Sequence, residues 1–157
     1  MDFDKRLEKA IERGQRAGNA QAQEAAKAAM GEEELRRLHS QYRLELSEHI
    51  EACLKKLPDH FPGFRFSTQM GGATVSRDDL GRSRDTHRET FLSRLEMTIR
   101  PFSSYHVLEL TSKGTIRNKE VFNRTNFQRL AEADLTTFRE SIDQWILEFA
   151  ELYAAKS

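Results

Sequence analysis

The segment that decides the fold covers residues 91–123 and reads FLSRLEMTIRPFSSYHVLELTSKGTIRNKEVFN. In its first part, Leu95, Met97 and Ile99 alternate with polar or charged residues. This period of two is typical of a strand that buries one face and exposes the other. The segment therefore predicts a sheet with one apolar face, which the rest of the chain must cover.

Two interruptions divide this segment into three strands. Residues 101–104, Pro-Phe-Ser-Ser, end the first strand, and residues 105–111 resume the alternation. Ser-Lys-Gly at 112–114 predicts a tight turn, because glycine adopts a positive φ without steric cost. Residues 115–123 follow as the third strand, so we expect an antiparallel meander.

The region before this meander predicts more strand structure and a loop. Residues 64–70 alternate, which predicts a strand with Phe64 and Phe66 facing the core. A pair of glycines then predicts a bend before a short strand at 73–76. Residues 77–90 contain a single apolar residue, which predicts a long exposed loop.

Two amphipathic helices are expected to cover the sheet. Residues 32–57 carry apolar side chains at spacings of three and four, and Pro58 ends this run. Residues 134–155 show the same pattern more strongly, with Asp134 as N-cap and Trp145 as an anchor in the core. Strands bounded by helices define the α+β class. We therefore expect a two-layer fold in which an antiparallel sheet of three to five strands packs on both helices.

The N-terminal residues 2–30 predict a third helix that has little to bury. Phe3, Leu7 and Ile11 form a narrow apolar stripe, and an alanine-rich stretch follows them. Alanine favours helix strongly but offers little side chain for packing. This helix is therefore either a frayed terminal segment or an arm that pairs with a second copy or docks on a partner.

A chain of 157 residues is long enough for one domain with a real core. We expect a single domain over 1–157, composed of a helical arm at 1–30 and an α+β core at 31–157. Although the formal net charge is zero, residues 60–130 carry an excess of basic side chains and residues 131–157 an excess of acidic ones. The zero net charge argues against strong general attraction to nucleic acid or to an anionic membrane.

The chain contains one cysteine, so it has no internal disulfide, and this favours a reducing compartment. Its N-terminus is charged from the second residue and lacks the apolar core of a secretory signal. No stretch approaches the roughly 18 apolar residues that a membrane span needs. We therefore expect a cytoplasmic protein without a membrane partner.

Signals for catalysis or metal binding are weak. His49 and Cys53 lie four residues apart, a spacing that can chelate a metal, but no second cysteine or nearby histidine completes the set. Cys53 falls on the apolar stripe of its helix, so we expect it to pack in the core. The sequence therefore predicts no catalytic residue, no metal and no cofactor.

The outward-facing side of the sheet is the most informative surface. If Leu95 and its alternating neighbours face inward, basic residues of several strands face outward, and the polar loop at 77–90 adds more. The candidates for partner or nucleic-acid binding are Arg65, Arg94, Arg100, Tyr105, Arg117, Lys119, Arg82, Arg84, His87 and Arg88.

Three functions remain open. The favoured one is a non-enzymatic module for protein binding or assembly, resembling an adaptor or chaperone in kind, with a homodimer as one form, because the arm at 1–30 is poorly able to bury itself. The second is nucleic-acid binding through the basic sheet face and the loop at 77–90. The third is a small-ligand protein or enzyme with a cleft between the C-terminal helix and the sheet.

Overall fold

The computed structural model describes residues 2–82 and 88–156, without the side chains of residues 23–30, 81, 82, 88 and 89. The chain divides into two units, Met1–Arg37 and Leu38–Ser157. The described part of the first unit, which we name the N-terminal unit, is helical throughout and belongs to α1 (Asp2–Leu54). The second unit, which we name the core unit, contains the end of α1 and all other elements.

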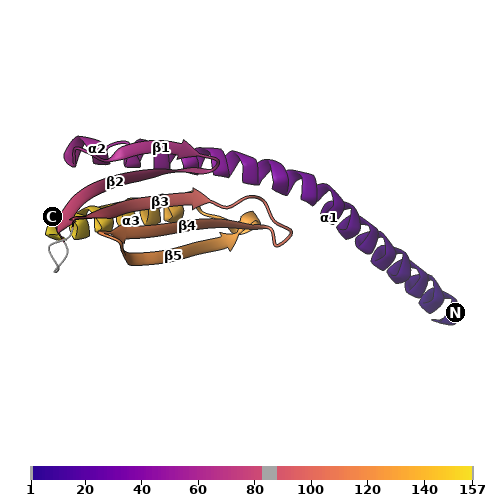
Figure 1. The fold of residues 1–157 in the computed structure, drawn as a ribbon. Coiled ribbons are helices and arrows are strands. Elements are labelled where there is room, and N and C mark those ends of the chain that lie inside the picture. Colours follow the sequence, from indigo (N-terminus) through magenta and orange to yellow (C-terminus); the bar gives the residue numbers. More distant parts are fainter. Residues whose placement is uncertain (1, 83–87, 157) are drawn as a thin grey trace. The chain divides into compact units, whose positions relative to one another are not determined.

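The elements of the core unit form one antiparallel sheet and its helices (Figure 1). They follow α1 in this order: α2 (Leu57–His60), β1 (Arg65–Gln69), β2 (Gly72–Arg82), β3 (Arg88–Ile99), β4 (Val107–Ile116), β5 (Lys119–Arg129), the 3-10 helix η1 (Leu130–Glu132) and α3 (Leu135–Lys156). The five strands lie in chain order, β1-β2-β3-β4-β5. This meander confirms the predicted α+β class with an antiparallel sheet.

One face of the sheet forms the core. Leu95, Met97 and Ile99 of β3 are fully buried, as their alternation predicts. Ala73 of β2 lies opposite Met97 in the register and is also fully buried. The buried faces of α3 and of the end of α1 complete this core through Leu46, Ile50, Leu54, Phe138, Ile142 and Phe149.

Helix α3 begins as its sequence predicts. Asp134 is the N-cap, because its Oδ1 accepts a hydrogen bond of 3.0 Å from the backbone N–H of Thr136. The buried stripe differs in detail from the predicted one, since Trp145 is only half-buried while its neighbour Ile146 is buried. Trp145 therefore flanks the core and does not anchor it.

The predicted turn at 112–114 is wrong. Strand β4 runs through these residues to Ile116, and the turn lies at Arg117 and Asn118, whose φ angles are 50° and 69°. Two successive positive φ angles are typical of the tight turns that join antiparallel strands, and asparagine tolerates them well. The side chain of Asn118 also accepts a 2.7 Å hydrogen bond from the backbone N–H of Leu92, which fixes the turn beside β3.

The predicted strand at 73–76 is present but longer than expected, and the predicted loop at 77–90 is wrong at 77–82 and 88–90, whereas 83–87 lie outside the described residues. Strand β2 extends to Arg82, and β3 begins at Arg88, its partner in the register. Backbone pairing stabilises this part of the hairpin without apolar alternation, and Arg77 forms an ion pair with Asp79 at 2.7 Å. Polar composition alone therefore gave the wrong secondary structure here.

The predicted separation of a helix at 2–30 from one at 32–57 is wrong, because α1 continues through Gly31 from Asp2 to Leu54. One glycine inside a helix costs about 1 kcal/mol relative to alanine, and good helix formers on both sides outweigh that cost. The helix ends three residues earlier than the predicted end at 57, and Leu57 starts the separate turn α2. Within residues 2–82 and 88–156, no helix has the length and apolarity needed to cross a membrane.

Candidate functional site

The sheet face opposite the helices carries several of the predicted binding residues. Arg65 on β1, Arg94 on β3 and Arg100 just after β3 are exposed, as expected. Their charge is partly balanced, since Arg94 lies 3.4 Å from Glu96 in an ion pair. Glu96 also lies opposite Lys113 of β4 in the register. This face is therefore polar and of mixed charge.

Two predicted residues do not extend that outer face, and a third lies outside the strands. Arg117 lies in the β4–β5 turn, with its guanidinium 4.9 Å from the centre of the Phe91 ring. Lys119 pairs with Ile116, whose side chain is buried, so the register places Lys119 on the core side of the sheet. Tyr105 is exposed, but it lies in the connection between β3 and β4. The expected placement of Arg117 and Lys119 on the outer face was wrong, whereas the expected role of Tyr105 beside that face stays a prediction.

The remaining predicted residues lie near the tip of the β2–β3 hairpin. Arg82 and Arg88 are partners in the register at the last described pair of this hairpin, and their side chains are not described. Arg84 and His87 lie outside the described residues. Their proposed role in binding stays a prediction.

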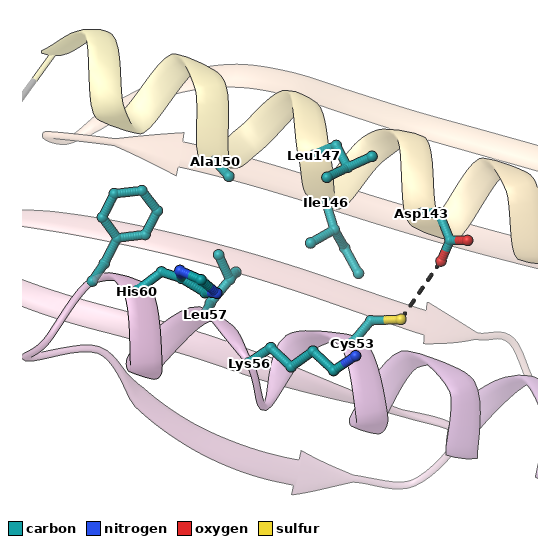
Figure 2. Close-up of a pocket in the computed structure, with 9 residues that line it drawn as sticks. Cys53, Lys56, Leu57, His60, Asp143, Ile146, Leu147 and Ala150 are labelled. Carbon is teal, nitrogen blue, oxygen red and sulfur yellow. Dashed lines mark hydrogen bonds between the residues drawn. The ribbon is translucent and has the colours of Figure 1, made fainter.

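A pocket of about 470 Å³ lies between the end of α1, α2 and α3. Figure 2 shows α3 on one side of it, with Ile146, Leu147 and Ala150, and Cys53 and Leu57 on the other. The polar groups at this pocket are those of Cys53, Lys56, His60 and Asp143. It is thus an apolar pocket with a few polar groups, the usual composition of a small-ligand site.

Three potential ligand groups meet at one end of this pocket. His49 and Cys53 lie on α1, and Asp143 lies on α3. The Nε2 of His49 is 2.7 Å from Oδ1 of Asp143, and the thiol of Cys53 donates to the same oxygen at 3.5 Å. The Cys53 Sγ is also 3.7 Å from His49 Nε2. Figure 2 shows Cys53 and Asp143 pointing toward each other across the two helices.

The electrostatics of this cluster do not fit a nucleophilic cysteine. Burial, followed by the negative charge of Asp143 and the hydrogen bond to it, raises the pKa of the Cys53 thiol above its usual value. A catalytic cysteine needs the opposite shift, toward the thiolate. In a relay, the histidine contacts the nucleophile and the carboxylate through different nitrogens, whereas here Nε2 of His49 faces both.

Sequence reasoning identified only part of this cluster. The spacing of His49 and Cys53 was visible, but Asp143 was not connected with them. Cys53 is half-buried beside the pocket, so its expected packing inside the core was wrong. The available signal was indirect: Cys53 lies on the apolar stripe of one helix, and Asp143 lies next to the stripe of the other helix that was predicted to cover the same sheet face.

The N-terminal unit presents a different kind of surface. Phe3, Leu7 and Ile11 are 69%, 48% and 52% exposed, respectively. A Cβ added at Gly14 or Gly18 would meet no atom within 4 Å other than the adjacent residues and the nearby backbone of its own helix. The apolar stripe predicted from sequence is therefore present on α1 and is not covered by the described residues of the chain.

Comparisons with known proteins assign no function to these surfaces. No family model, no curated protein and no solved structure matches the chain.

Proposed function

We propose that the protein is a homodimeric assembly module whose N-terminal unit pairs with that of a second copy in an antiparallel coiled coil. The observation that carries this proposal is the exposed stripe of Phe3, Leu7 and Ile11 on α1. Apolar side chains at spacings of four on a helix form the type of seam through which helices associate. A second copy supplies an identical seam.

Burial of this stripe limits how tightly two copies can associate. Transfer of a Phe, Leu or Ile side chain from water to an apolar contact stabilises by about 1.5–3 kcal/mol when the whole side chain is buried. The six side chains of two copies are about half exposed, so together they contribute on the order of 5–10 kcal/mol. Association itself costs about 4–15 kcal/mol. The net gain is therefore at most about 6 kcal/mol, and we expect a weak dimer that dissociates at roughly tens of micromolar or above.

The charge pattern favours the antiparallel orientation. Residues 5–16 contain five Lys or Arg and two Glu, whereas residues 22–33 contain three Glu and one Lys. A parallel pair would place the basic segments of the two copies side by side, which is repulsive. An antiparallel pair centred near residue 19 places each basic segment beside the acidic segment of the other copy.

The same alignment also brings side chains of compatible size together. It places Phe3 of each copy opposite Leu35 of the other, so large apolar residues meet at both ends of the pair. The middle of the seam contains small residues, including Gly14, Ala17 and Gly18. Because the separation of packed helices is set by the side chains between them, this composition allows a close approach.

Light scattering coupled to size-exclusion chromatography tests the proposal on the full chain. We expect a mass that approaches twice that of one 18.2 kDa chain as the concentration rises above roughly 100 μM. The double variant Leu7→Glu/Ile11→Glu places four charges in the seam of a dimer and is expected to be monomeric. Circular dichroism of this variant verifies that the helix remains formed.

Leu44 provides a matched control, because it is 60% exposed on the same helix but lies in the core unit. Leu44→Glu is expected to leave the dimer intact. A wild-type chain that remains monomeric at high concentration would refute the proposal, and so would a Leu7→Glu/Ile11→Glu variant that dimerises like the wild type.

A further inference from the structure

We infer that His49, Cys53 and Asp143 form a binding site for a divalent transition-metal ion of the zinc type. Among the described residues, these three form a group whose nitrogen, sulfur and carboxylate ligand atoms all lie within 4.8 Å of one another. Zinc binds imidazole nitrogen, thiolate sulfur and carboxylate oxygen, commonly in tetrahedral geometry. The ligand types therefore match the ion.

The distances between the ligand atoms are close to those of a tetrahedral site. Metal–ligand bonds of about 2.0–2.3 Å imply ligand–ligand distances of roughly 3.3–3.7 Å. The Cys53–His49 and Cys53–Asp143 distances, 3.7 and 3.5 Å, already have these values. Only the 2.7 Å separation of His49 and Asp143 must widen, by about 0.6 Å. Asp143 is exposed, so rotation of its side chain achieves this without disturbing the core.

The scaffold holds the three groups on rigid elements. His49 and Cys53 are four residues apart on α1, so they share one face of the helix. The residue after His49, Ile50, is fully buried, and the residue before Asp143, Ile142, is also fully buried. Both helices are therefore anchored in the core next to the ligands, which favours a preformed site.

The charges of the site also suit a divalent cation. A Cys53 thiolate and the Asp143 carboxylate together neutralise an ion of charge +2, and His49 contributes as a neutral ligand. Lys56 is the cationic group of the adjoining pocket, and Figure 2 shows it on the α1 side, next to Cys53. With two anionic ligands neutralising the ion, one neighbouring ammonium group does not prevent its binding.

Three protein ligands leave one coordination position open, and the pocket adjoins Cys53 and Asp143. Zinc sites with three protein ligands generally hold water or a small ligand in the fourth position. We assign that position to water, because His60 lies farther along the pocket wall, at α2, in Figure 2. The remaining wall is apolar, so a molecule that replaces this water would have a metal-binding head and an apolar body.

Titration of untagged, chelator-treated full-length protein with Co²⁺ and Zn²⁺ tests the inference. We expect one equivalent of metal per chain by calorimetry, and a sulfur-to-cobalt charge-transfer band together with the visible absorption of tetrahedral cobalt. Cys53→Ser is expected to abolish the charge-transfer band. His49→Gln and Asp143→Asn are each expected to weaken binding by at least about 10–100-fold, the loss typical even of supporting partners of a metal site.

Two nearby residues serve as matched controls. Asp59→Asn and His60→Gln change a carboxylate and an imidazole at the same end of the core unit, and we expect both variants to bind one equivalent with unchanged affinity. Zn²⁺ is expected to raise the melting temperature of the wild type but not that of Cys53→Ser, which separates loss of binding from loss of folding.

The inference fails if the wild type does not take up one equivalent of either metal. It also fails if Cys53→Ser binds as tightly as the wild type, or if a control variant loses as much affinity as a ligand variant. The Leu7→Glu/Ile11→Glu variant is expected to bind metal normally, so the dimer and the metal site can be refuted separately.

Discussion

The ring of Phe122 on β5 lies directly against Gly114 on β4. The two residues are partners in the register, and a Cβ added to Gly114 would lie 2.9 Å from the Phe122 ring. A β-bulge follows Gly114, and Phe122 is buried on the core side of the sheet. Gly114 is therefore required for packing within a strand, whereas its sequence context resembles a turn.

Replacement of Gly114 by alanine is expected to destabilise the fold. Overpacking of this type costs about 1–3 kcal/mol. This exceeds the roughly 0.4–1 kcal/mol gained from a less flexible unfolded chain. Urea unfolding measures the loss, and a double-mutant cycle with Phe122→Leu is expected to show that the smaller side chain relieves it.

Ser112 provides the control for this prediction. It lies on the same face of β4 and is buried, and its hydroxyl has no hydrogen-bond partner among the described residues. Ser112→Ala is therefore expected to change stability little. A Gly114→Ala variant as stable as the wild type would show that the ring of Phe122 does not pack as described.

Gly31 tests the continuity of α1. A Cβ at this position would meet no atom within 4 Å other than the adjacent residues and the nearby backbone of its own helix, and the glycine has no positive φ. Gly31→Ala is therefore expected to stabilise the helix by up to about 1 kcal/mol. Circular dichroism during thermal unfolding measures this gain. If Gly31 instead ended one helix in a left-handed conformation, alanine would lower the helix content and the melting temperature.

The ion pair between Arg124 of β5 and Glu148 of α3 predicts a pH-dependent contribution to stability. Arg124 Nη2 donates to Glu148 Oε1 at 2.8 Å, and a second hydrogen bond joins the same two groups. The hydrogen bond from Arg124 lowers the pKa of Glu148 below its usual value of 4.5. The contribution is therefore complete above about pH 4.5 and is lost as the pH falls through the lowered pKa.

Because both side chains are about one-third exposed, we expect Glu148→Gln to lower the unfolding free energy at pH 7 by no more than about 1 kcal/mol. The difference from the wild type is expected to shrink in urea titrations as the pH falls below about 4.5. Glu45→Gln is the control, because Glu45 lies 3.8 Å from Arg139 in a looser exposed pair. Equal losses in both variants at every pH would contradict the role given to Glu148.

The burial of His39 predicts a second pH-dependent contribution to stability, at a pH closer to neutrality. It is buried against the edge of the Phe102 ring, and its Nε2 has no hydrogen-bond partner among the described residues. Burial, followed by the positive charge of Arg43, lowers the pKa of His39 below 6.5. His39 therefore binds a proton more readily in the unfolded chain than in the folded one. As a result, the unfolding free energy falls as the pH drops below about 6.5.

The substitution His39→Asn keeps a short polar side chain but removes the titrating group. We expect the unfolding free energy of the wild type to decrease more steeply between pH 7 and pH 5 than that of His39→Asn. Denaturant unfolding at each pH measures both slopes. Identical slopes would show that His39 does not contribute to this pH dependence.

The alternation of buried and exposed residues predicted most of the fold. Leu95, Met97 and Ile99 identified the core side of β3, and helical spacing identified the helices that cover it. The errors have physical causes. Gly114 resembles a turn residue although it serves packing, and residues 77–82 form a strand through backbone pairing that leaves no apolar pattern.

The site was less predictable than the fold. Spacing within α1 revealed His49 and Cys53, because residues four apart share a helix face. Asp143 could not be joined to them, since its position depends on how α1 and α3 pack side by side over the sheet. The expected placement of Lys119 on the outer face of the sheet was wrong for a similar reason. The side of the sheet on which Lys119 lies depends on the position of the β4–β5 turn.

Distance measurement between spin labels tests the antiparallel pairing most directly. In a Cys53→Ser background, single cysteines at Lys5 and at Asn19 place labels on the outer side of the paired helices. With a helical rise of 1.5 Å per residue and a pair centred near residue 19, we expect roughly 40–50 Å between labels at position 5 and roughly 20 Å at position 19. Short distances at both positions would establish a parallel pair, and the absence of any defined distance would show that the N-terminal units do not pair.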